Sequence, residues 1–152
     1  MKQFFTLLVT VLTFSAFALA QETFVLDSFE NGLVNFTDVV NGNPPAHFDY
    51  AVVDNPVKAG INTSNKVWEW KRFDAEADNK IWAGFYATLK TEIPKGYHRI
   101  EVKYLRKNAT SQLKIKCEGA VSKEIAPVNA ASKTNEWETL VFDIYANGIK
   151  NI

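Results

Sequence analysis

The side chains of this chain best suited to chemistry are aromatic rings that alternate with charged groups. Ring and charge alternate in the run VWEWKR, so Trp68, Trp70 and Arg72 share one side of an extended segment. Trp82 and Tyr86 follow on a later apolar run. Indole faces match the apolar face of a sugar ring, and a nearby charged donor can fix the orientation of its hydroxyls. These five residues predict a platform for a hydroxyl-rich ligand.

The same rings have a second interpretation, in which they fill the interior of a β-sandwich. Large aromatic residues supply much of the buried area of folded proteins, and Trp68, Trp70 and Trp82 are suited to that role. The sequence leaves both interpretations open. They differ in one observable, which is whether solvent reaches the indoles.

Lys116 and Glu118 are a second candidate pair. They are two residues apart, so in a strand both point away from the side taken by Ile115. The pair can supply polar contacts to a ligand. It can equally form an exposed ion pair of small energetic value.

Motifs for catalysis or metal binding do not emerge from the sequence. His47 and His98 are the only histidines, and neither has the spacing of a metal ligand. The nucleophile-elbow pattern of a serine hydrolase is missing, and the alternation around Cys117 favours a small core residue. We therefore expect a non-catalytic protein and predict neither a cofactor nor a metal.

Residues 1–20 have the three parts of an export signal. Lys2 gives the positive start, residues 4–17 the apolar stretch, and Ala18-Leu19-Ala20 the cleavage pattern. The apolar stretch is shorter than the roughly 20 residues of a spanning helix, so we expect no membrane span. The sequence predicts a secreted, periplasmic or cell-surface protein that begins at Gln21.

The remaining 132 of the 152 residues, 21–152, suit one domain. Lys2 leaves with the signal, so 16 basic residues face 17 acidic ones and the net charge is −1. Nucleic-acid binding needs a concentrated basic surface, which this balance argues against. Cys117 is the only cysteine, so packing rather than an intramolecular disulfide must stabilise the domain.

Strand-like alternation recurs between turn-forming clusters along the whole domain, and no sustained helical period is visible. The expected strands are 23–29, 47–53, 66–73, 81–89, 97–106, 112–118 and 137–144. Because no helical crossover is available, neighbouring strands should pair antiparallel. The pattern predicts an all-β fold with two antiparallel sheets in a sandwich.

The last residues, 146–152, look like a turn that enters a new apolar strand and then stops. An unpaired sandwich edge would expose backbone groups and core side chains. We therefore expect that the chain is truncated at its C-terminal side.

Several segments together resemble galactose-binding-domain-like jelly rolls of bacterial secreted proteins. These segments are the turn-forming run Val53–Val67, the opening Leu26–Glu30, and the runs 82–86, 113–118 and 136–143. The resemblance implies a jelly roll and the function of a carbohydrate-binding module, with polysaccharide as partner beside other domains of a glycan-degrading system. The alternative is a structural or protein-interaction jelly roll.

The resemblance also bears on metal binding. Members that hold a structural calcium often take one ligand from an acid like Glu30 and another from C-terminal strands that have no counterpart here. Calcium is therefore possible but not predicted.

Overall fold

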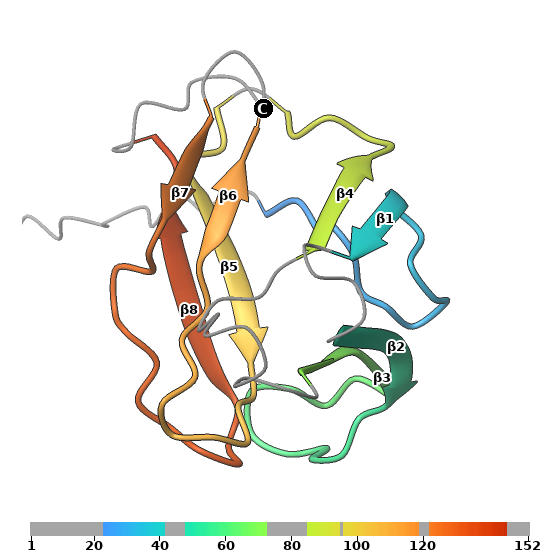
Figure 1. Cartoon of the computed structure of the whole chain (residues 1–152), viewed down its shortest axis with the longest axis vertical. Helices are drawn as coiled ribbons and strands as arrows, with labels where there is room; N and C mark the ends of the chain where they lie inside the picture. The colour runs from blue at the N-terminus through green and yellow to red at the C-terminus, as the bar shows by residue number, and fades with distance from the viewer. Residues whose placement is uncertain (1–22, 42–47, 73–84, 95, 119–121, 146–152) are drawn as a thin grey trace, which may run out of the picture.

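In a computed structural model of the chain, the described residues are 23–41, 48–72, 85–94, 96–118 and 122–145. The regular elements among them are all β-strands, as Figure 1 shows. Their bounds are β1 Phe36–Asn41, β2 Phe48–Asp54, β3 Lys66–Arg72, β4 Phe85–Leu89, β5 Arg99–Tyr104, β6 Ile115–Cys117, β7 Lys123–Ile125 and β8 Glu138–Asp143. The expected all-β class is confirmed.

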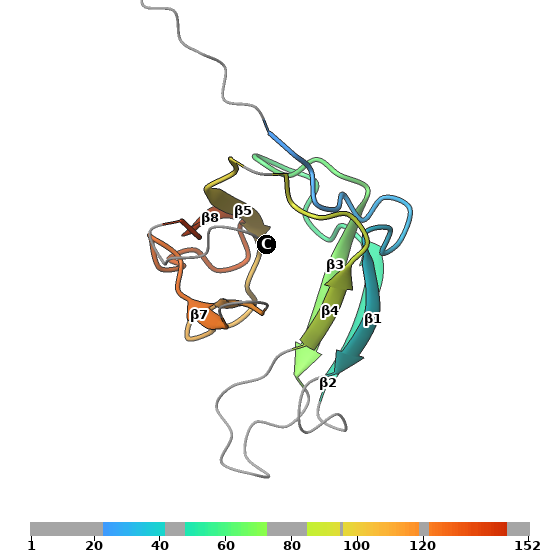
Figure 2. The ribbon, with the colours of Figure 1, turned by 90° about the horizontal axis from the view of Figure 1, so that it is seen from above.

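The strands pair two by two, and each pair is antiparallel. β1 pairs with β4, β2 with β3, β5 with β8 and β6 with β7. Figures 1 and 2 place β1 to β4 on one side of the molecule and β5 to β8 on the other. We call these groups the N-terminal half and the C-terminal half.

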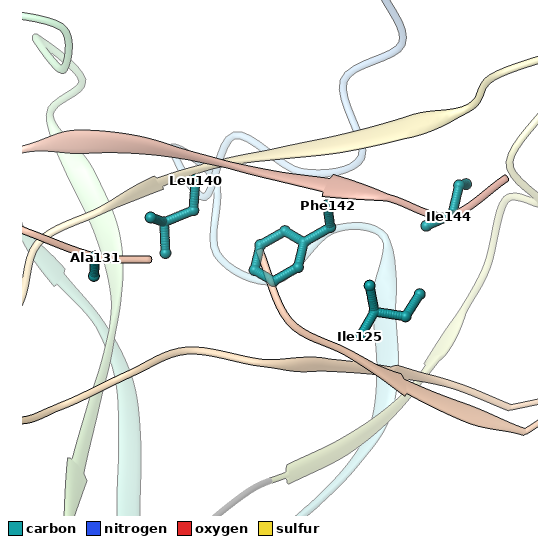
Figure 3. Packing of buried hydrophobic residues seen from close by; sticks show 5 residues of the cluster. All are labelled: Ile125, Ala131, Leu140, Phe142 and Ile144. Carbon is teal, nitrogen blue, oxygen red and sulfur yellow. The ribbon is translucent and has the colours of Figure 1, made fainter. Parts of the chain in front are cut away.

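The C-terminal half encloses an apolar core. In β5, Ile100, Val102 and Tyr104 face inward while the charged residues between them are exposed. Leu140 and Phe142 project from β8 toward Ile125 of β7 (Figure 3). The cluster also contains Ala131 and Ile144, and the partly buried Leu113, Ile115 and Cys117 pack against it. Cys117 is therefore partly buried against the core, on the side that the alternation in the sequence predicts.

Residues 23–29 do not form the expected strand. The carboxylate of Asp27 accepts hydrogen bonds from the backbone amides of Phe29, Val34 and Asn35, each at 2.9 Å. Phe29 also has a positive φ of 62°, which interrupts an extended backbone. The segment is therefore a loop. Its backbone amides bond to the Asp27 side chain instead of to a neighbouring strand.

Two strands are present that the sequence analysis did not predict. β1 contains a shift in register between Thr37 and Val40, and Asp38 within it has a positive φ of 51°. Such a bulge breaks the period-two pattern by which strands are recognised. β7 has only three residues, which is too short for a period to be visible.

Residues 54–65 form the ordered connection that their composition predicts. The side-chain amide of Asn55 donates to the carbonyls of Asn62 and Ser64, at 3.3 and 3.0 Å, and its oxygen accepts from the Val57 amide at 2.9 Å. The indole nitrogen of Trp137, just before β8, donates to the Val57 carbonyl at 2.7 Å. The connection is thus held by hydrogen bonds within itself and by one hydrogen bond to the C-terminal half.

Several expectations fall on residues outside the described ranges. They are the export signal at 1–20, the strand start at 81–84 with Trp82, and the C-terminal segment 146–152. In the described ranges, no helix is long and apolar enough to cross a membrane.

Candidate functional site

Trp68 and Trp70 lie on one face of the β2–β3 hairpin, as the alternation in the sequence predicts. In the register of the hairpin, Val52 faces Trp68 and Tyr50 faces Trp70. Both indoles are only partly exposed, and the nitrogen of each is buried. Each tryptophan is therefore partly accessible to solvent, whereas the polar atom of its indole is not.

The ring of Trp68 belongs to an aromatic cluster. Its centroid lies 5.7 Å from that of Phe29, 5.5 Å from that of Phe36 and 6.0 Å from that of Tyr50. The tilted and edge-on arrangements are those that aromatic pairs prefer. Tyr50 also donates its hydroxyl to the carbonyl of Val39 at 3.3 Å, which joins β2 to β1. Trp68 thus packs the two sheets of the N-terminal half against each other.

Three of the predicted site residues, Tyr86, Lys116 and Glu118, come together between the two halves. Tyr86, on β4, is 51% exposed, and the ammonium of Lys116 lies over its ring, 5.9 Å from the centroid. Lys116, on β6, also forms an ion pair with Glu118. The hydrogen bond to Glu118 and the charge of that carboxylate raise the pKa of Lys116, so the lysine is cationic at neutral pH. An aromatic ring, a donor and an acceptor therefore share one surface.

Lys114 and Glu124 extend this surface across the β6–β7 hairpin. Glu124 of β7 faces Lys116 in the strand register, and its carboxylate lies 2.6 Å from the ammonium of Lys114. All four charged groups are exposed, and Ile115 and Cys117 between them turn toward the core. Lys114 and Glu124 were not among the predicted residues. The alternation around Lys114 was visible in the sequence, but the partner strand β7 was not.

The contacts of the described residues join three of the predicted site residues, Tyr86, Lys116 and Glu118. Trp68 and Trp70 belong to the β2–β3 hairpin, whereas Tyr86 belongs to the separate β1–β4 sheet. The backbone of Arg72 pairs with Phe48 at the end of the β2–β3 hairpin. Trp82 lies outside the described residues. The ligand role of the tryptophans and of Arg72 stays a prediction.

Cys117 and Glu30, two groups that could serve catalysis or metal binding, have other roles in the structure. Burial raises the pKa of the Cys117 thiol, which keeps it in the poorly nucleophilic protonated form. Glu30 accepts a hydrogen bond from the Asn65 amide at 2.6 Å. Within those residues, no three His, Cys, Asp or Glu side chains are grouped as a metal site would require.

The chain matches no protein-family model, no curated protein and no solved structure. The resemblance to galactose-binding-like jelly rolls is therefore carried by the sequence segments alone and stays a prediction.

Proposed function

We propose that this chain is an exported, non-catalytic carbohydrate-binding module that holds polysaccharide weakly at its surface. The proposed architecture is the antiparallel two-sheet jelly-roll sandwich, with the two halves contributing to its layers. Its support is the all-β chain, the antiparallel pairing of every described strand and the export-signal pattern of residues 1–20.

The observation that carries the proposal is the surface of Tyr86, Lys116 and Glu118. A half-exposed ring offers apolar area to the C–H face of a sugar. The ammonium of Lys116 can donate to a sugar oxygen, and the carboxylate of Glu118 can accept from a sugar hydroxyl. The surface combines apolar area with orienting groups, which is the combination that sugar binding needs.

The test is a binding screen of the purified chain against soluble glycans by calorimetry and against insoluble glycans by sedimentation. We expect weak binding to at least one polysaccharide. Tyr86→Ala should then weaken it by roughly tenfold or more, because a lost aromatic contact of about 1.4 kcal/mol changes affinity by that factor.

Tyr145→Ala is the matched control, because Tyr145, just after β8, is 52% exposed and its ring lies against His98 instead of Lys116. This variant should bind like the original chain. Failure to bind any glycan, or equal losses in both variants, would contradict the proposal.

A second candidate function is a structural or protein-interaction module. The packing of Trp68 among the rings of Phe29, Phe36 and Tyr50 favours it, because a ring committed to holding two sheets together has little face left for a sugar. Iodide quenching of tryptophan emission tests whether the indoles themselves take part in ligand binding. Strong quenching that a bound glycan suppresses supports sugar binding at the indoles, whereas weak quenching with no glycan effect assigns the indoles a packing role, and the calorimetric screen then decides between the two functions.

A further inference from the structure

The charges on the outer face of the β6–β7 hairpin balance each other. The face carries two ammonium groups, Lys114 and Lys116, and two carboxylates, Glu118 and Glu124. Lys114 is paired with Glu124 and Lys116 with Glu118. Each positive group beside Tyr86 therefore already has a negative partner on the protein.

This pairing works against an anionic ligand. A uronate or sulfate group that approaches Lys116 meets the carboxylate of Glu118 at the same place, and Glu124 lies across the hairpin from it. Like charges repel, and displacing Glu118 would leave that carboxylate without its partner. Surfaces that bind anionic polymers instead gather cationic groups that have no acidic neighbour.

The same pairing suits an uncharged ligand. A sugar hydroxyl can donate to Glu118 and accept from Lys116 at once, because a hydroxyl group is both donor and acceptor. Such a ligand does not need to break the ion pair. The exposed face of Tyr86 supplies the apolar contact next to it.

We propose that the ligand of the Tyr86, Lys116 and Glu118 surface is an electrically neutral polysaccharide, and that uronate- and sulfate-bearing polymers are excluded by the carboxylates. The inference rests on the proposed function and adds the class of ligand to it.

The experiment compares neutral and anionic polysaccharides in one calorimetric series. Xyloglucan, galactomannan, laminarin and agarose are the neutral probes, and alginate, polygalacturonate and carrageenan are the anionic ones. Each is measured at about 20 mM and about 500 mM sodium chloride, since salt screens exposed charges. We expect binding to a neutral probe, with an affinity that changes by less than about twofold between the two salts.

The outcomes are distinct. Binding to an anionic probe that weakens steeply with salt would overturn the neutral-ligand inference and leave the carbohydrate-binding function intact. Binding to none of the probes would overturn both.

Glu118→Gln sharpens the test, because it leaves the ammonium of Lys116 without its carboxylate. We expect this variant to gain affinity for alginate or polygalacturonate at low salt by roughly threefold or more. Glu136→Gln is the control, since it removes the acid of another exposed ion pair, with Lys133 in the loop before β8. A similar gain in both variants would show that only net charge matters and would overturn the inference.

Discussion

The two halves of the molecule bury different kinds of side chain. In the C-terminal half the most enclosed residues are aliphatic or aromatic, with Phe142 fully buried and Leu140 at 1% exposure. Among the described residues of the N-terminal half, Val67 is the only buried hydrophobic residue, and it is accompanied by the buried Asn35, Asn55 and Asn62. One half is thus held by apolar burial and the other by asparagine hydrogen bonds and half-exposed rings.

The largest expected effect comes from Phe142→Ala in the C-terminal half. Removal of a fully buried ring should lower the free energy of unfolding by about 3–5 kcal/mol, from lost burial and the cavity that remains. Urea denaturation followed by circular dichroism measures it. Thr139→Ala, exposed on the same strand, should change stability by less than about 0.5 kcal/mol. A loss below about 1 kcal/mol for the Phe142 variant would mean that this half has no tight core.

The next largest effect on stability is expected from Asn55→Ala in the N-terminal half. The variant leaves the carbonyls of Asn62 and Ser64 and the amide of Val57 without their partner, so we expect a loss of about 2 kcal/mol. Amide hydrogen exchange should show that residues 54–65 lose protection while β5 and β8 keep theirs. Asn129→Ala, in an exposed loop, serves as the control. Uniform loss of protection across both halves would refute the local role of Asn55.

Substitution of Glu138, the first residue of β8, should have a smaller effect on the free energy of unfolding, and this effect should depend on pH. Burial alone would raise the pKa of Glu138, but hydrogen bonds from the amides of Ser132 and Lys133 and from the Ser132 hydroxyl outweigh it, with help from the charge of Arg106. The folded pKa is therefore below the ordinary value of 4.5. The stabilisation is complete above that ordinary value and is lost as pH falls through the folded pKa.

Because Glu138 is only partly buried, the contribution should be no more than about 1 kcal/mol. Urea midpoints measured between neutral pH and pH of about 3 should fall less steeply for Glu138→Gln than for the original chain. Identical pH profiles would show that the hydrogen bonds do not favour the charged form.

The smallest effect is expected from Glu124→Gln on the β6–β7 hairpin. Its ion pair with Lys114 is exposed at both ends, so stability should change by less than about 0.5 kcal/mol. Thermal unfolding of the variant beside the original chain measures this. A larger loss would mean that the charges on this face hold the hairpin together instead of meeting a ligand.

Periodicity in the sequence predicted the C-terminal half better than the N-terminal half. β5 lies within the expected strand 97–106 and β8 within the expected strand 137–144, and one face of each meets a core. In the N-terminal half, the Asp27 loop replaces an expected strand, and the bulge at Asp38 hides β1. Hydrogen bonds between a side chain and distant amides leave no period for a sequence pattern to reveal.

For the candidate site, the spacing of residues along a strand predicted which side chains point the same way, but not which residues of other strands lie beside them. Lys116 and Glu118 point the same way, as residues two apart in a strand must. That Tyr86 of β4 lies beside Lys116 depends on how separate sheets meet, and the role of Glu124 depends on the short strand β7. Both are contacts between segments far apart in sequence, on which local alternation carries no information.

The hydrogen bond from Trp137 to Val57 joins positions 80 residues apart. The entropy lost on closing a loop grows with its length, so this bond is costly to form while the chain between its ends is extended. We therefore expect it to form late in folding, after the hairpins of each half exist. In a variant whose other three tryptophans are replaced by phenylalanine, the emission of Trp137 should change in the last kinetic phase of refolding.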